Sequence, residues 1–134
     1  MVKVIIFADG ASIGNPGPAA IGAVVKDEKG ENLSTISKRI GNATNNQAEY
    51  HALLSALDEA VNLGADEVDI KLDSELVVRQ LLGRYKVKAK ALKPLYGRVK
   101  EQLVKFRSYR IAHISGERNV EAHRLAHRAL KKSF

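Results

Sequence analysis

The chain has 134 residues, of which 45% are hydrophobic and 28% charged, and its formal net charge is +7. This size and balance suit one globular domain and leave little room for a second. Because the chain contains no cysteine, disulfide bonds, thiolate metal sites and cysteine nucleophiles are excluded. The lack of cysteine is compatible with a reducing compartment, and we expect a cytoplasmic protein.

The charge is divided unevenly along the chain. Residues 1–75 hold 6 Lys and Arg against 12 Asp and Glu, a net charge of −6, whereas residues 76–134 hold 16 against 3, a net charge of +13. A basic half indicates a polyanionic partner such as a nucleic acid. A solvated surface of Lys and Arg is the alternative, and charge by itself does not separate the two.

The first 40 residues predict three strands in an antiparallel meander. A β-branched, apolar strand over 2–8 stops at Asp9-Gly10, and the Gly- and Pro-rich stretch 10–18 is expected to be a loop. Strands over 19–26 and 31–40 follow, separated by a turn. The first apolar run covers about six residues. A membrane span needs roughly 20, so we expect neither membrane insertion nor a signal peptide.

The rest of the chain alternates helices with strands. Apolar residues at helical spacing predict a helix over 46–63, with capping side chains before it and Gly64 after it. Next come a strand over 67–72, a helix over 75–82, a basic connector over 83–90, a helix over 92–105, a strand over 107–114 and a helix over 119–131. This order favours an α/β fold with a mixed five-stranded sheet and helices on its faces, in a single domain over 1–134.

Three acidic residues stand at unusual positions. Asp9 and Asp73 each end a predicted strand, and Glu49 falls in the first turn of the helix over 46–63. If the first and fourth strands are parallel neighbours, Asp9 and Asp73 lie side by side. Their repulsion would be relieved by Mg²⁺ or Mn²⁺, which prefer oxygen ligands. Taken singly, such an Asp is more often a turn former and such a Glu a partner of the helix dipole.

Three ordered motifs resemble those of the type 1 ribonuclease H family. They read Asp9-Gly10-Ala11-Ser12 with Asn15-Pro16-Gly17-Pro18, then Thr44-Asn45-Asn46-Gln47-Ala48-Glu49, then Asp73-Ser74-Glu75-Leu76. The resemblance covers nearly the whole chain. It implies a ribonuclease H-like fold, with the sheet in the order 3-2-1-4-5 and helices on both faces. It also implies an endonuclease that hydrolyses the RNA strand of RNA–DNA hybrids with two Mg²⁺ or Mn²⁺ ions.

The resemblance implies roles for individual residues. Asp9, Glu49 and Asp73 would be catalytic metal ligands, and Thr44 would help to hold a phosphate of the DNA strand. Gly10 is a further expected substrate contact. Asn15, Asn45, Asn46 and Gln47 would face the minor groove of the hybrid, where 2′-hydroxyl groups distinguish RNA from DNA. Turn or helix-cap roles are the alternative for the Asn residues, and both roles can coexist.

The chain departs from the family pattern in its last helix. The family carries its fourth metal ligand there, in a segment resembling Asn-x-x-Ala-Asp, and this chain reads Asn119-Val120-Glu121-Ala122-His123. An imidazole binds Mn²⁺ better than Mg²⁺. We therefore expect His123 to complete the catalytic metal site with an altered metal preference, and a spectator role is the alternative. His127, one turn later, could pair with it on a metal, although two surface imidazoles are the simpler interpretation.

The basic connector is the remaining expected contact with the substrate. Larger members of the family grip the DNA strand with a longer basic protrusion, and here Lys86 and Lys88 would serve instead. Phosphate contacts of this kind make binding fall steeply with salt. The expected partner is thus an RNA–DNA hybrid, with no obligatory protein partner.

Two other functions use the same residues. His123 could weaken the metal site enough to leave a non-catalytic module that binds hybrids or double-stranded RNA. A nuclease that prefers double-stranded RNA is a further alternative, because recognition by shape leaves little trace in sequence motifs.

Overall fold

The structure, a computed structural model, describes residues 2–131, and within them five strands form one mixed sheet. The sheet order is β3-β2-β1-β4-β5, as the family resemblance implied. β1 pairs antiparallel with β2 and parallel with β4, and β2–β3 and β4–β5 pair antiparallel and parallel respectively. The strands are β1 Lys3–Ser12, β2 Gly17–Lys26, β3 Asn32–Ala43, β4 Glu67–Leu72 and β5 Ser108–His113.

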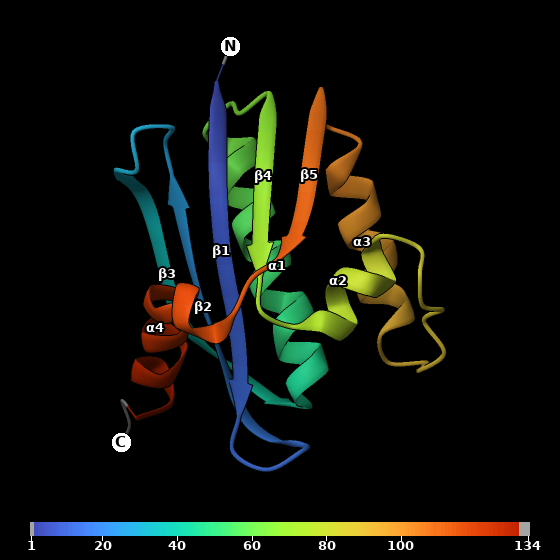
Figure 1. The fold of residues 1–134 in the computed structure, drawn as a ribbon. Helices are drawn as coiled ribbons and strands as arrows, with labels where there is room; N and C mark the ends of the chain where they lie inside the picture. Colours follow the sequence, from blue (N-terminus) through green and yellow to red (C-terminus); the bar gives the residue numbers. More distant parts are fainter. Residues whose placement is uncertain (1, 132–134) are drawn as a thin grey trace.

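Helices cover both faces of the sheet in this part of the chain (Figure 1). α1, α2 and α3 lie on one face, whereas α4 lies on the other, against β1, β2 and β3. The helices are α1 Asn45–Asn62, α2 Glu75–Leu81, α3 Lys93–Leu103 and α4 Val120–Lys131, with a short 3₁₀ turn, η1, at Gly116–Arg118. The prediction of a mixed sheet with helices on its faces is confirmed, while η1 was not predicted. Within residues 2–131 no helix is long and apolar enough to cross a membrane.

The main core lies between the sheet and α1. Alternate residues of β1 and β4 point into it, including Val4, Ile6 and Ile70, which are at most 1% exposed. A smaller cluster, containing Ala11, Ala20 and Ala126, lies beneath α4. Since alternate residues of a strand point to opposite faces, β1 divides its side chains between these two layers.

Two predicted boundaries on β1 and β2 are wrong. The stretch 10–18 was expected to be a loop, but β1 continues to Ser12 and β2 begins at Gly17. The reason is pairing across the hairpin, which matches Gly10 with Ile21 and Ser12 with Ala19. The single domain predicted over 1–134 stays a prediction, and residues 1 and 132–134 lie outside the described part.

Gly22 allows α4 to lie directly on β2. A Cβ at this position would lie 2.1 Å from the Ala122 carbonyl oxygen and 2.4 Å from the Ala126 nitrogen. Any larger side chain must therefore push α4 away from the sheet. Gly97, inside α3, differs because nothing lies within 4 Å of a Cβ built there.

We expect Gly22→Ala to lower the free energy of unfolding by roughly 1–3 kcal/mol, as overpacking does elsewhere. Gly97→Ala is the matched control and should raise it by about 0.5–1 kcal/mol, because Gly is unfavourable inside a helix. Urea unfolding followed by circular dichroism measures both. A Gly22→Ala protein as stable as the unsubstituted one would contradict the close packing of α4.

Candidate active site

The candidate active site lies where β1 extends past the end of β4. The two strands pair from Lys3↔Glu67 to Ala8↔Leu72, after which β4 ends and β1 continues for four more residues. Asp9 and Asp73 follow the last pair directly, so they lie side by side as predicted. The expectation that Asp9 ends its strand is wrong, because the strand remains paired with β2 through Ser12.

Glu49 reaches this place from α1 on the other face of the sheet. A Cβ on Gly10 would lie 2.2 Å from the Ala48 carbonyl carbon, so only glycine lets α1 come this close to β1. The Gly10 backbone N–H donates a hydrogen bond of 3.1 Å to Glu49 Oε1. α1 begins at Asn45, which places Glu49 in the second turn rather than the predicted first turn.

The three carboxylates form one cluster. Each offers a ligand oxygen, and among the described residues these atoms all lie within 4.8 Å of one another. Asp9 is only 5% exposed. Burial, reinforced by the neighbouring Asp9 carboxylate, raises the pKa of Glu49 far above its ordinary range. Burial, followed by the charge of Asp9, likewise raises the pKa of Asp73. A bound cation would relieve the electrostatic repulsion among these crowded carboxylates.

A divalent cation fits this donor set. Glu49 Oε2 is buried and has no hydrogen-bond partner within residues 2–131. In the same part of the chain, the salt bridges include no Lys or Arg paired with any of the three carboxylates. Three carboxylates held close together, with one buried oxygen that has no donor, match the preference of Mg²⁺ and Mn²⁺ for hard oxygen ligands.

His123 lies beside the cluster on α4. Its Nδ1 atom is 2.9 Å from Asp9 Oδ2, and its side chain is 57% exposed. The His127 ring stacks against it with a centroid separation of 4.1 Å. Burial, together with the neighbouring His123, lowers the pKa of His127. His123 thus approaches the cluster through Asp9 and is not one of the three groups that share the 4.8 Å spacing.

Asn119 is a site residue to which no role was assigned from the sequence. It is 1% exposed, and its Nδ2 donates a 2.9 Å hydrogen bond to the Ala8 carbonyl oxygen. Its own backbone carbonyl oxygen accepts a bond from the His123 backbone N–H, and its side-chain amide acts against the raised pKa of Asp73. Asn119 therefore ties the start of α4 to β1 next to Asp9. Its place in the Asn-x-x-Ala segment was the available clue.

The residues predicted to contact substrate gather at the start of α1. Thr44 and Gln47 form a capping box, in which the Thr44 hydroxyl accepts from the Gln47 N–H and the Gln47 side chain accepts from the Thr44 N–H. Asn15 Oδ1 accepts a 3.0 Å bond from the Asn45 N–H, and Asn45 Oδ1 accepts from Ser12. The alternative of turn and cap roles is therefore realised for these side chains.

The remaining predicted contacts are Asn46, Gly10 and the two lysines of the connector. Asn46 is half-buried beside the capping box, and Gly10 lies beneath α1. Lys86 and Lys88 are exposed in the connector between α2 and α3. This connector runs on the side of the sheet away from α4 (Figure 1). The structure thus places Gly10, Asn15 and residues 44–47 together at the start of α1, near the carboxylates. The two lysines lie apart from them.

Comparison with known proteins gives a matching family and similar curated relatives. A family model described as reverse transcriptase-like matches residues 7–129. A protein of Mycobacterium tuberculosis, described as bifunctional, is 46% identical over 130 residues, covering 96% of this chain and 36% of its own length. Ribonuclease HI of Halobacterium salinarum is 41% identical over 128 residues, covering 96% of this chain and 64% of that protein. The chain spans only part of the length of these curated relatives.

Solved structures resemble the whole described fold. The N-terminal RNase H domain of the mycobacterial protein gives a TM-score of 0.94 at 46% identity, covering 97% of this chain and 100% of that one. RNase H1 of Halobacterium salinarum gives 0.95 at 40% identity, covering 98% and 99%. LC11-RNase H1 in complex with an RNA/DNA hybrid gives 0.91 at 41% identity, covering 97% and 98%.

The sheet order and the carboxylate cluster at the end of β4 define a ribonuclease H-like domain. The chain belongs to the reverse transcriptase-like family and, within it, to the type 1 ribonucleases H.

The crowding of the carboxylates predicts how stability depends on pH. The pKa of Glu49 in the folded protein lies above its ordinary value of 4.5. The contribution of Glu49 to the free energy of unfolding is therefore fully present below pH about 4.5, and it is lost as the pH rises through the raised pKa of the folded protein. We expect Glu49→Gln to stabilise the metal-free protein at pH 8 by about 1 kcal/mol or more, and to have little effect near pH 4.

Thermal unfolding in EDTA at several pH values measures this effect, with Glu28→Gln in the exposed turn after β2 as the control. Adding Mg²⁺ should raise the unfolding temperature of the unsubstituted protein more than that of Glu49→Gln. Equal stability of Glu49→Gln and the unsubstituted protein at pH 8 would show that the three carboxylates do not repel as described.

Proposed function

We propose that this protein is an endonuclease that hydrolyses the RNA strand of RNA–DNA hybrids. The observation that carries the proposal is the cluster of Asp9, Glu49 and Asp73, whose ligand atoms lie within 4.8 Å of one another in the described chain. Two relatives support the substrate class: one is named ribonuclease HI, and the other was solved in complex with an RNA/DNA hybrid.

The cluster is the proposed site for two Mg²⁺ or Mn²⁺ ions, with Asp9, Glu49, Asp73 and His123 as ligands. Ions bound there would activate a water and stabilise the leaving oxygen of a phosphodiester. Asp9 is placed to serve both parts of the site, because its carboxylate lies among the acids and also contacts His123. Asn119 holds the start of α4 against Ala8 and thereby fixes where His123 meets Asp9.

The start of α1 is the proposed surface for the minor groove of the hybrid. Asn15 and Asn45 use their Oδ1 atoms within the protein, so each can still direct its Nδ2 donor outward. Bases present oxygen and nitrogen acceptors in the minor groove, and RNA adds the 2′-hydroxyl. Asn46, Gln47, Gly10 and Thr44 complete this proposed surface. Lys86 and Lys88 would contact the DNA strand of the hybrid. The proposed location of the protein is the cytoplasm.

The contact between His123 and Asp9 supports a second candidate function. His123 stands where the family carries an Asp, so this position lacks the negative charge of that Asp. If the weakened site no longer holds both ions, the protein would bind hybrids or double-stranded RNA without cutting them.

Incubation with labelled RNA–DNA, RNA–RNA and DNA–DNA duplexes in Mg²⁺ or Mn²⁺ separates these functions. We expect cleavage of the RNA in the hybrid, and Asp73→Asn should lower the rate at least about a hundredfold because it removes a ligand charge. Asp69→Asn is the matched control, because Asp69 lies on β4, four residues before Asp73, and pairs with Lys3. Cleavage of the hybrid that persists in Asp73→Asn would place the chemistry elsewhere, and binding without cleavage would favour the second function.

The metal preference tests His123. We expect the unsubstituted protein to favour Mn²⁺, and His123→Asp to shift the ratio of Mg²⁺ to Mn²⁺ activity upward by about tenfold, a scale typical of altered metal sites. Calorimetric titration of each protein with Mn²⁺ and Mg²⁺ gives the affinities independently of activity. Identical affinities and rates in the two proteins would show that His123 takes no part in the metal site.

A further inference from the structure

A hollow adjoins the carboxylate cluster on the face of the sheet that carries α4. Phe7 lies two residues before Asp9 on β1 and therefore shares its face. Lys71 is the partner of Phe7 on β4 and lies two residues before Asp73. At about 3.3 Å per residue, the row formed by Phe7 and Lys71 lies about 7 Å from the row formed by Asp9 and Asp73.

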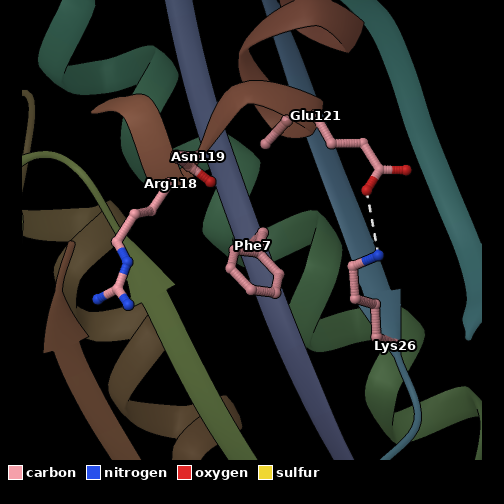
Figure 2. Close-up of a pocket in the computed structure, with 6 residues that line it drawn as sticks. Phe7, Lys26, Arg118, Asn119 and Glu121 are labelled. Carbon is pink, nitrogen blue, oxygen red and sulfur yellow. Dashed lines mark ion pairs between the residues drawn. The ribbon is translucent and has the colours of Figure 1, made fainter. Parts of the chain in front are cut away.

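Arg118 closes this hollow from the side of α4. One cavity of about 270 Å³ is lined by Phe7, Lys71, Ile114 and Arg118. A second, of about 80 Å³, shares Phe7 and Arg118 with it. Figure 2 shows the Arg118 side chain extending from the segment before α4 toward β4, beside the Phe7 ring. The same segment borders the active site, because a Cβ on Gly116 would lie 3.9 Å from Asp73 Oδ2.

The two cations of the hollow are available for an anion. In the described residues, the salt bridges and side-chain hydrogen bonds leave both Lys71 and Arg118 without a partner. Neighbouring lysines on this face differ, since Lys3 pairs with Asp69 at 3.4 Å and Lys26 pairs with Glu121 at 3.1 Å (Figure 2). Lys71 and Arg118 therefore form a positively charged site about 7 Å from the carboxylate cluster along β1 and β4.

We propose that Lys71 and Arg118 form a phosphate subsite for the strand that is cleaved. This subsite rests on the proposed function. One strand rises about 3.4 Å per nucleotide and the two rows of residues are about 7 Å apart, so the subsite holds a phosphate one or two nucleotides from the scissile bond. The Arg118 guanidinium offers paired donors to phosphate oxygens, and the Lys71 ammonium adds a point charge. Phe7 forms the apolar floor between them. The subsite thereby sets the position of the RNA strand along the carboxylate cluster.

Binding tests the subsite without requiring cleavage. Fluorescence anisotropy in EDTA measures the affinity for a short RNA–DNA hybrid at several salt concentrations. Lys71→Gln with Arg118→Gln should weaken binding about fivefold at low salt and reduce the slope of log affinity against log salt by about 0.7–0.9 for each phosphate that the protein no longer neutralises. Lys29→Gln with Lys105→Gln removes the same charge at exposed positions elsewhere and should change neither quantity by as much. An unchanged affinity and slope in the first variant would overturn the proposal.

Cleavage then locates the phosphate. Hybrids carrying one uncharged methylphosphonate at successive RNA positions should be cut more slowly when the phosphate held by the subsite is replaced. In the protein with Lys71→Gln and Arg118→Gln, a methylphosphonate at that RNA position should no longer slow cleavage. The reason is that the methylphosphonate and the two substitutions remove the same interaction. Lys29→Gln with Lys105→Gln should leave the sensitive position unchanged. Equal sensitivity at every position in the unsubstituted protein and the subsite variant would overturn the proposal. If no hybrid is cut, the proposed function is wrong, and the anisotropy comparison still decides whether the subsite exists.

Discussion

The repulsion among three crowded carboxylates is the constraint on which the site depends. Burying acidic groups together is costly unless a cation or a proton compensates them. The fold nevertheless holds Asp9, Glu49 and Asp73 within reach of one another. It does so by ending β4 four residues before β1, which leaves an opening that Glu49 enters from α1. The destabilisation at this point is the condition for binding metal, since ligands that did not repel one another would gain less from a cation.

Both helices that border the site depend on direct backbone contact with the sheet. Gly10 admits α1 on one face, and Gly22 admits α4 on the other. Asn119 adds a buried hydrogen bond between the start of α4 and Ala8. The distances among the proposed metal ligands are therefore set by close backbone packing and by one buried hydrogen bond. A change at any of these three residues would move a proposed metal ligand without touching it.

Local sequence patterns predicted the order of the elements along the chain, whereas the adjacency of Asp9 and Asp73 depended on a sheet order that only the family resemblance implied. Hydrophobic periodicity and turn residues carry that information because they act over a few neighbouring residues. The end of β1 was mispredicted because Gly10 to Ser12 are strand residues only by virtue of their partners on β2. The role of Asn119 escaped for the same reason, since its partner Ala8 lies 111 residues away in sequence. The motifs named His123, but only the folded chain shows that it meets Asp9.

The capping box and the Asn15–Asn45 contact have a consequence for the entropy of binding. Ser12, Asn15 and Asn45 join the β1–β2 turn to the start of α1 through hydrogen bonds within the protein. Ordering a mobile side chain at an interface costs about 0.5–1.5 kcal/mol, and groups that are already fixed avoid much of this loss. A hybrid would therefore meet a surface that is shaped before contact. Under the proposed function, discrimination between RNA and DNA would depend on whether a 2′-hydroxyl fits that surface, rather than on whether the protein can rearrange to accept it.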